Sequence, residues 1–217
     1  MPGDEAAPTL RERNKARARS EIAAAALRLF GERGFAGVTV DEIVGAAGVS
    51  RRTFFRYFDT KEDALLADYP ELNIRLTETL DSSPDEPIEA VRAGLHRLAE
   101  WYVERSEAVL ERSRVIRDAL HLAARNLEFL SQWERAIACT LAGPIGRDPG
   151  DLLPRTAAAA VVGAFRAALT QWVRSSCTED LHALTDQALD LVGDGIASQL
   201  HHPPAATGRS RPPKSAR

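Results

Sequence analysis

The chain has 217 residues, of which 44% are hydrophobic and 27% charged, with a formal net charge of −3. This composition is that of a globular protein long enough to bury a core in one or two domains. No run reaches the roughly 18 apolar residues that span a bilayer, and the start, MPGDEAAP, lacks the apolar core of a signal peptide. We therefore expect a cytoplasmic protein that does not associate with a membrane.

The charge is divided unevenly along the chain. Residues 9–61 hold 11 Lys and Arg against 6 Asp and Glu, a net charge of +5, whereas residues 62–201 hold 13 against 23, a net charge of −10. A basic head on an acidic body orients the molecule toward a polyanion such as DNA. The segment RERNKARAR at 11–19 fits a helix extension, a flexible arm that follows phosphates, or a solvating tail; we assign residues 1–18 to a flexible basic arm.

The first predicted helices are short and well delimited. Residues 19–33 carry apolar side chains at helical spacing and are followed by Gly34. Thr39, with Glu42 three residues later, is the pattern of a capping box at the start of a second helix. Gly48 fits the left-handed residue that ends this helix, because glycine adopts that conformation at little cost.

A third helix is expected to begin after Ser50, a good N-cap residue. Its spacing places Phe54 and Phe58 on one face and Arg52 and Arg56 on the opposite face. Arg51 and Arg52 lie in the first turn, where the helix dipole disfavours cations, and Arg52 and Arg56 repel each other one turn apart. Both penalties suggest an external anion. DNA supplies phosphates and, in the major groove, the O6 and N7 atoms of guanine. Residues 39–61 therefore indicate a DNA-binding helix-turn-helix, with a solvated basic face as the alternative.

Residues 23–65 resemble the TetR family of transcriptional regulators. The resemblance rests on the F-x-x-x-G-F segment from Phe30 to Phe35 and on Phe55, Phe58 and Lys61 at the end of the motif. It implies that Thr39 and Lys61 bind phosphates, that exposed residues of the third helix face bases, and that Phe55 and Tyr57 lie against the DNA backbone. The DNA-binding residues expected on this basis are Thr39, Ser50, Arg51, Arg52, Thr53, Phe55, Arg56, Tyr57 and Lys61.

One position departs from the family pattern. Family members often carry a basic residue near the start of the first helix of the motif, where this chain has Asp41. The resemblance therefore implies that specificity depends more strongly on Arg51, Arg52 and Arg56.

The remaining chain also has a helical pattern, without a convincing alternation typical of strands. We expect a helix at 60–69 that Pro70 bends or ends, a polar break at 81–87, and a clear loop at 143–151. Further helices are expected at 87–104, 107–123, 126–143, 151–175 and 179–200. The predicted fold is all-α, with a helix-turn-helix domain at 19–65, a helical ligand-binding and dimerisation domain at 66–201, and a disordered basic tail at 202–217.

The last two predicted helices have faces suited to pairing. One side of the first carries small residues, including Ala160, Gly163 and Ala167, and the second carries a leucine stripe. In the TetR family these helices form the dimer interface, so the resemblance implies a homodimer on a palindromic operator. The alternative is that both stripes close the core of one chain.

Large side chains between the predicted body helices are candidates for an effector site. We expect Trp101, Tyr102, His121, Trp133 and Phe165 to contact a largely apolar ligand, with Arg114 or Arg117 meeting an anionic group. The alternative for each ring is ordinary core packing. The C-terminal half also looks similar to regulators associated with mycofactocin systems, some of which respond to fatty acyl thioesters.

Other functional classes receive little support. The sequence has no G-x-S-x-G, H-E-x-x-H, phosphate-binding loop or Cys-x-x-Cys motif, so we expect no enzyme activity, metal or cofactor. The sequence is best interpreted as that of a homodimeric repressor that a small molecule releases from double-stranded DNA. An activator, or an architectural DNA-binding protein without ligand control, is the alternative.

Overall fold

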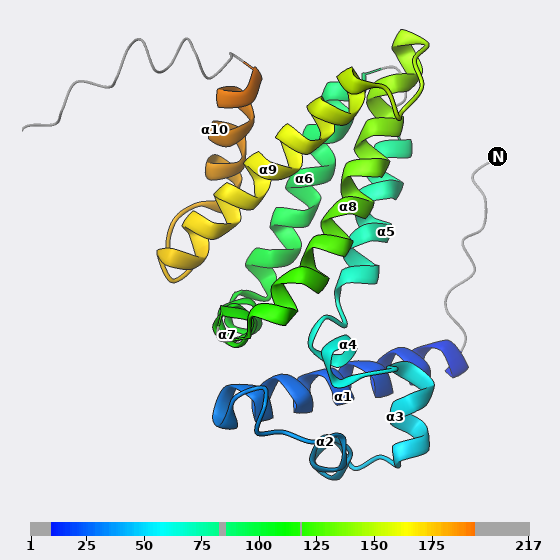
Figure 1. Cartoon of the computed structure of the whole chain (residues 1–217), viewed down its shortest axis with the longest axis vertical. Helices are drawn as coiled ribbons and strands as arrows, with labels where there is room; N and C mark the ends of the chain where they lie inside the picture. Colours follow the sequence, from blue (N-terminus) through cyan, green and yellow to red (C-terminus); the bar gives the residue numbers. More distant parts are fainter. Residues whose placement is uncertain (1–9, 83–85, 118, 194–217) are drawn as a thin grey trace, which may run out of the picture.

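The computed structural model describes residues 10–82, 86–117 and 119–193, and within them it contains helices and no strand. An N-terminal head lies below a taller helical body (Figure 1). The head comprises α1 (Leu10–Arg33), α2 (Val40–Ala47), α3 (Arg51–Tyr57) and α4 (Lys61–Leu65). The body comprises α5 (Tyr69–Asp81), α6 (Pro87–Glu104), α7 (Ser106–Arg117), α8 (Leu120–Ala142), α9 (Leu152–Arg174) and α10 (Leu181–Gly193). The predicted all-α fold is confirmed.

The basic segment near the N-terminus is helical from Leu10 onward, because α1 begins nine residues before the predicted position. Arg17 forms an ion pair with Glu21 one turn later, at 2.8 Å, which supports this first part of the helix. The helix extension is therefore the correct alternative for residues 10–18, and the flexible arm assigned there is wrong. Residues 1–9 lie outside the described part of the chain.

The region around Pro70 also differs from the prediction. Pro70 lies in the first turn of α5, where a missing backbone N–H costs nothing, and so it starts a helix where we expected it to end one. The predicted helix at 60–69 is shortened to α4 for this reason. Leu72, Leu76 and Leu80 of α5 are buried at every fourth position and anchor this helix in the body core.

Helix α7 ends at Arg117 and α8 begins at Leu120, so the boundary between them lies before its predicted place near residue 125. No glycine or proline marks this place in the sequence. The change of direction allows Val115 of α7 and Leu122 of α8 to join the buried cluster of the head, together with Phe30, Phe54 and others. Packing therefore determines this boundary, and it connects head and body through a shared apolar cluster.

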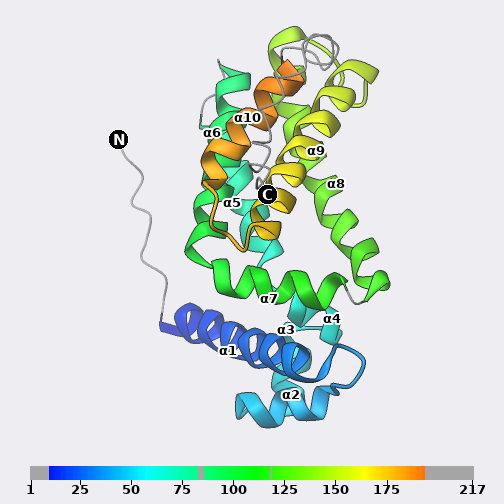
Figure 2. The same ribbon diagram turned by 90° about the vertical axis from the view of Figure 1, so that its left-hand side faces the viewer.

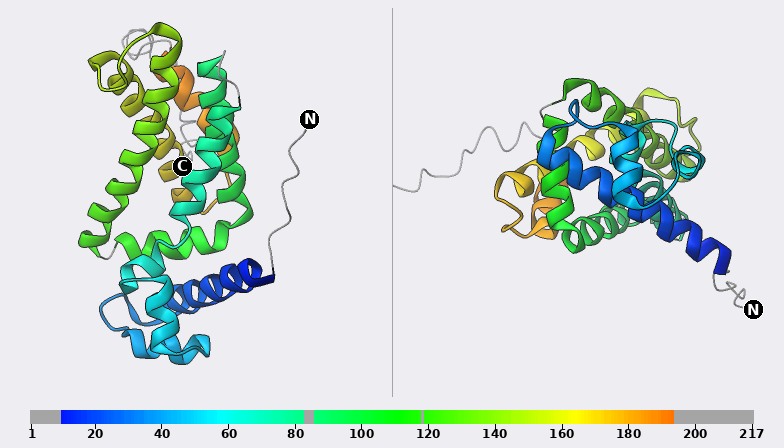
Figure 3. Two further views of the ribbon diagram at one scale, coloured as in Figure 1. Left: turned by 90° about the vertical axis from the view of Figure 1, so that its right-hand side faces the viewer. Right: turned by 90° about the horizontal axis from the view of Figure 1, so that it is seen from below.

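The long helices of the body pack around a second core. Trp101, Trp133, Phe165 and Trp172, from α6, α8 and α9, are each no more than 2% exposed in it. Helix α7 lies across the base of the body, directly above α1 (Figure 2). Seen from below, α1 crosses the end of the body, and the left-hand view shows α7 between head and body (Figure 3).

By length and composition, α9 could cross a membrane, and it is the only described helix that could. A single helix of this kind is weak evidence for a span, because core helices of globular proteins have the same composition. Packing in the body accounts for part of the apolar surface: α9 lies between α8 and α10, with Ala158, Val162 and Ala168 buried.

Helix α10 is tied to α6 by a polar cluster. Arg92 of α6 contacts Asp186 at 2.5 Å and Asp190 at 3.0 Å. His96 Nδ1 lies 2.7 Å from His182 Nδ1, and His96 Nε2 lies 2.9 Å from Asp186. These contacts fix α10 against the body up to Gly193; the end of the predicted helix at 179–200 and the predicted tail at 202–217 lie outside the described residues.

Candidate nucleic-acid interface and the cavity beside it

Helix α2 begins with the predicted capping box. The Thr39 hydroxyl accepts a hydrogen bond from the Glu42 backbone N–H at 3.3 Å, and the Glu42 carboxylate accepts one from the Thr39 N–H at 2.8 Å. Arg33 of α1 adds an ion pair to Glu42 at 2.6 Å. Thr39 is therefore used as a cap, and its exposed position still allows the expected contact with a phosphate.

These contacts make the head sensitive to acid. The Thr39 backbone N–H, assisted by Arg33, lowers the pKa of Glu42 from 4.5 to about 2. Because the folded-state pKa is lowered, the stabilisation is present above pH 4.5 and is lost as the pH falls toward 2. We expect the thermal midpoint of the wild type to fall more steeply over this range than that of Glu42→Gln. Parallel curves for the two proteins in calorimetry would contradict this assignment.

A tight turn sets α3 against α2. Gly48 has φ 66°, in the left-handed region, and its N–H donates to the end of α2. Ser50 then caps α3, its hydroxyl accepting the Thr53 N–H at 3.1 Å. The predicted helix-turn-helix is confirmed, with Ser50 and Thr53 engaged at the start of its second helix.

Helix α3 has the two predicted faces. Phe54 and Phe58 are 0% and 3% exposed and belong to the core of the head. Arg52 and Arg56 are exposed on the other side. The buried rings fix the axial rotation of α3, so the arginine side is presented to solvent as one surface.

The three arginines of α3 differ in their surroundings. Arg51 forms an exposed ion pair with Asp41 at 3.2 Å, and Arg56 donates to the Tyr57 hydroxyl at 2.9 Å. Arg52 has no hydrogen-bond or ion-pair partner among the described residues. Its guanidinium is therefore available for an external partner, whereas Asp41 already offsets the charge of Arg51.

The aromatic residues expected at the DNA backbone lie beside these arginines. Phe55 is 47% exposed and lies under the guanidinium of Arg51, whose carbon is 5.9 Å from the ring centroid. Tyr57 is half-buried, with the Arg56 guanidinium 4.7 Å from its ring centroid. The rings thus hold two arginine side chains close to the surface of α3.

Lys61 has a structural role that the sequence did not reveal. Its Nζ donates hydrogen bonds to the carbonyl oxygens of Phe35 and Val38, both at 2.8 Å, and lies 4.4 Å from the Phe35 ring centroid. The ammonium therefore fastens α4 to the loop between α1 and α2. One of its three N–H groups is left for the expected phosphate contact, which stays a prediction.

Removing this ammonium should loosen the head. We expect Lys61→Met, which keeps most of the aliphatic chain, to lower the free energy of unfolding by about 1.5–3 kcal/mol, the range for hydrogen bonds to charged groups. Denaturation in urea measures it. Arg28→Met is the control, since the ion pair of exposed Arg28 is with Glu32 of its own helix. Equal stability of the two variants would show that the carbonyl contacts are unimportant.

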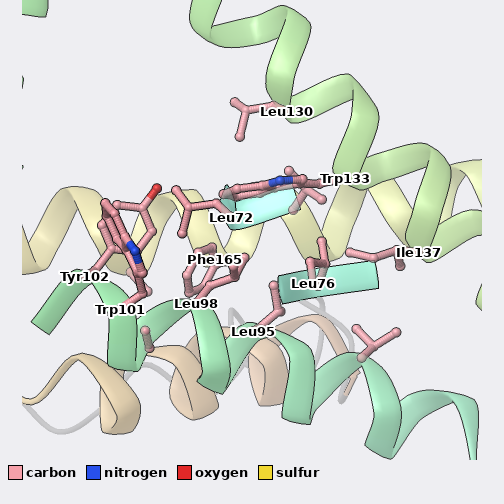
Figure 4. Close-up of a cluster of buried hydrophobic side chains, with 14 of the residues drawn as sticks. Leu72, Leu76, Leu95, Leu98, Trp101, Tyr102, Leu130, Trp133, Ile137 and Phe165 are labelled. Carbon is pink, nitrogen blue, oxygen red and sulfur yellow. The ribbon is translucent and has the colours of Figure 1, made fainter. Parts of the chain in front are cut away.

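A cavity of about 760 Å³ lies in the body, bordered by helices α5 to α9. Three of the predicted ligand residues line it, namely Tyr102, Trp133 and Phe165. The Phe165 ring lies between the other two, with its centroid 6.3 Å from each (Figure 4). Aliphatic side chains complete the apolar wall: Val109, Leu110, Ile116, Leu130, Leu169 and Val173.

Of the other two predicted ligand residues, the structure describes the side chain of Trp101 only. Trp101 does not line the cavity; it packs against Tyr102 in the core, with the Arg105 guanidinium 4.6 Å from its ring centroid. The core alternative therefore holds for Trp101. The side chain of His121 lies outside the described part of the structure.

The cavity also carries a group of arginines that the sequence identified only in part. Arg114 and Arg117 of α7 were expected; Arg112 of α7 and Arg166 and Arg174 of α9 also line it. No Asp or Glu is among the lining residues described, although the body is acidic overall. An apolar wall and several guanidinium groups together suit an amphipathic anion.

Two phenols at this cavity stay neutral over the physiological range. Burial raises the pKa of Tyr69 to about 12, and burial likewise raises that of Tyr102. Both hydroxyl groups therefore keep their protons, and the cationic character of the site comes from the arginines.

Comparison with known proteins connects both halves of the chain to transcriptional regulators. Residues 22–67 match the model of bacterial regulatory proteins of the tetR family, and residues 85–197 match the MftR C-terminal domain. MftR of Mycobacterium tuberculosis, a mycofactocin biosynthesis transcriptional regulator, is 34% identical over 81% of this chain and 89% of its own length. TcmR of Streptomyces glaucescens, an HTH-type transcriptional regulator, is 29% identical over 91% and 92%.

Solved structures support the same assignment. FadR of Thermus thermophilus, a TetR-family repressor in complex with lauroyl-CoA, has a TM-score of 0.59 and 25% identity, covering 91% of this chain and 100% of its own. FadR of Bacillus halodurans has a TM-score of 0.62 at 23% identity, covering 82% and 96%, and supports the fold. The chain belongs to the TetR family of DNA-binding transcriptional regulators and is not an enzyme.

Proposed function

We propose that this protein is a cytoplasmic, homodimeric repressor that binds a palindromic operator and leaves it when an amphipathic anion enters the cavity. The observation that carries the proposal is the combination of an apolar wall with an arginine cluster beside the head. The exposed face of α3 binds the operator, and the ligand in the cavity determines whether the protein is released from it.

The dimensions and chemistry of the cavity support an acyl-CoA-like effector. Its volume falls in the range of roughly 300–1,000 Å³ for small-molecule sites. An acyl chain would contact Trp133 and Phe165, and phosphate groups would meet the arginines. The lauroyl-CoA bound by the Thermus thermophilus relative combines these two parts.

An unpaired donor adds to this support. The indole N–H of Trp133 is buried and has no hydrogen-bond partner among the described residues, although Trp133 lines the cavity. Buried donors are normally satisfied, so a carbonyl oxygen of the effector would complete the site. The indole N–H of Trp101 is also unpaired but does not line this cavity.

The outer surface of α9 and α10 supports dimerisation. Ala159 and Ala167 are exposed on α9, and a Cβ placed at Gly163 would meet no atom of the described residues within 4 Å. Leu191 of α10 is 40% exposed. Small residues permit close approach of helices from a second subunit, and twofold symmetry would place two copies of α3 about 34 Å apart, one turn of DNA.

The effector must distinguish two arrangements of the dimer. A change from 99% bound to 99% released requires a preference of about 10⁴-fold for the released arrangement. Head and body share a buried cluster through Val115 and Leu122, so a displacement of α7 or α8 changes the position of the head.

Fluorescence anisotropy of a labelled operator, titrated with lauroyl-CoA, tests the proposal. We expect lauroyl-CoA to release the duplex, and CoA or laurate alone to act only at much higher concentration, because each fills one part of the cavity. Release by none of the three would reject this effector class. Tighter DNA binding with lauroyl-CoA would instead indicate a ligand-dependent binder, the activator alternative.

A further inference from the structure

One arginine touches both the effector cavity and the connection between head and body. Arg112 Nε donates a hydrogen bond to the carbonyl oxygen of Leu65 at 3.0 Å, and its Nη2 forms an ion pair with the carboxylate of Asp68. Leu65 ends α4, and Asp68 immediately precedes α5. One guanidinium therefore holds the turn that connects the DNA-binding helices to the first long helix of the body.

The same side chain lies between two hollows. Arg112 lines the cavity, and it also lines a groove of about 600 Å³ between α1 and α7. The side chain of Arg112 is 11% exposed and that of Asp68 is 30% exposed. Water therefore screens the Arg112–Asp68 ion pair only partly. A second anion near Arg112 in the cavity attracts the guanidinium strongly for the same reason.

A second contact shows that α7 presents one side to the cavity and another to the head. A Cβ at Gly31 of α1 would lie 1.7 Å from a carboxylate oxygen of Glu111, so the Glu111 side chain packs directly on α1 there. Glu111 accepts a hydrogen bond at 2.9 Å from Arg114, which lines the cavity. Arg112 therefore contacts the end of α4, and Arg114 is linked to α1 through Glu111. Figure 2 shows α7 lying directly above α1.

We propose that Arg112 is the positioning residue through which the cavity controls the head. The inference rests on the proposed function and names its coupling step. Without effector, Arg112 clamps the turn between Leu65 and Asp68. An anionic group in the cavity competes with Asp68 for the guanidinium and draws it away from the turn, because a bidentate pair is stronger than the single Nη2 contact with Asp68. The freed turn lets α4 swing and changes the separation of the two α3 helices.

The clamp is tested first without any effector. We expect Asp68→Asn to raise the dissociation constant for the operator by roughly 5- to 150-fold, the usual range of coupling between sites. Glu71→Gln is the matched control, since exposed Glu71 contacts Arg75 of its own helix. Equal operator affinities for the two variants would overturn the clamp, whatever the effector is.

Hydrogen exchange of backbone amides in the wild-type protein tests the clamp without any substitution. The backbone N–H of Leu66 donates to Glu62 at 3.0 Å and that of Tyr69 donates to Leu66 at 3.2 Å, so both amides report on the turn. We expect lauroyl-CoA to accelerate their exchange. Unchanged exchange despite bound lauroyl-CoA would overturn the clamp. If lauroyl-CoA does not bind, the proposed effector class is rejected. The operator affinities of Asp68→Asn and Glu71→Gln then test the clamp.

Discussion

Arg52→Ala is expected to weaken operator binding by roughly 1–3 kcal/mol in each half-site, the cost of losing one bidentate contact with guanine. In the proposed homodimer the substitution occurs twice, so the expected total is about 2–6 kcal/mol, or roughly 30-fold to 2 × 10⁴-fold. The reason is structural: Arg52 is exposed on α3 and is not engaged by another described residue. Anisotropy titrations at fixed salt concentration measure the change.

A second substitution at Arg52 separates the effect of the bidentate hydrogen bonds from the effect of the positive charge. Arg52→Lys keeps the positive charge and removes the planar fork, so it should lose most of the discrimination between operator and unrelated DNA. An equal loss on all sequences would reassign Arg52 to a phosphate. Wild-type affinity of Arg52→Ala for the operator would show that α3 reads DNA through other residues.

Phe54→Ala should have the largest effect on stability. Phe54 is 0% exposed, with its ring centroid 5.7 Å from that of Phe58, and it belongs to the core of the head. Truncation of a buried phenylalanine to alanine costs about 3–5 kcal/mol. Urea denaturation should therefore show a destabilised head, and operator binding should fall with the folded population.

The adjacent residue is a matched control. Phe55 is the same residue type on the same helix, but it is 47% exposed. We expect Phe55→Ala to change stability by no more than about 0.5 kcal/mol, as for surface substitutions, while still weakening DNA binding. Similar losses of stability in the two variants would contradict the assignment of buried and exposed faces to α3.

The helix-turn-helix could be predicted because its signals are local. Thr39, Gly48 and Ser50 act within a few residues of their own position, as a cap, a left-handed turn and a second cap. The faces of α3 follow from helical spacing alone. Such features need no knowledge of the surrounding fold, and the structure places them as predicted.

Features that depend on distant contacts could not be predicted. The carbonyl partners of Lys61 lie 23 and 26 residues earlier in the chain, so its structural role had no local signal, while its phosphate contact stays a prediction. Nothing in the local sequence sets Arg112, Arg166 and Arg174 apart from other helix arginines. Only the packing of α7 against α9 brings them to one cavity. The place of the break before α8 is likewise set by the shared cluster of head and body.

Selection of bound sites from random duplex DNA by the purified protein tests the central claim most directly. A twofold dimer that reads bases through α3 predicts enrichment of an inverted repeat with half-sites about one helical turn apart. Enrichment of a single half-site would contradict the dimer. Failure of the folded protein to enrich any sequence at low salt would contradict sequence-specific recognition by α3.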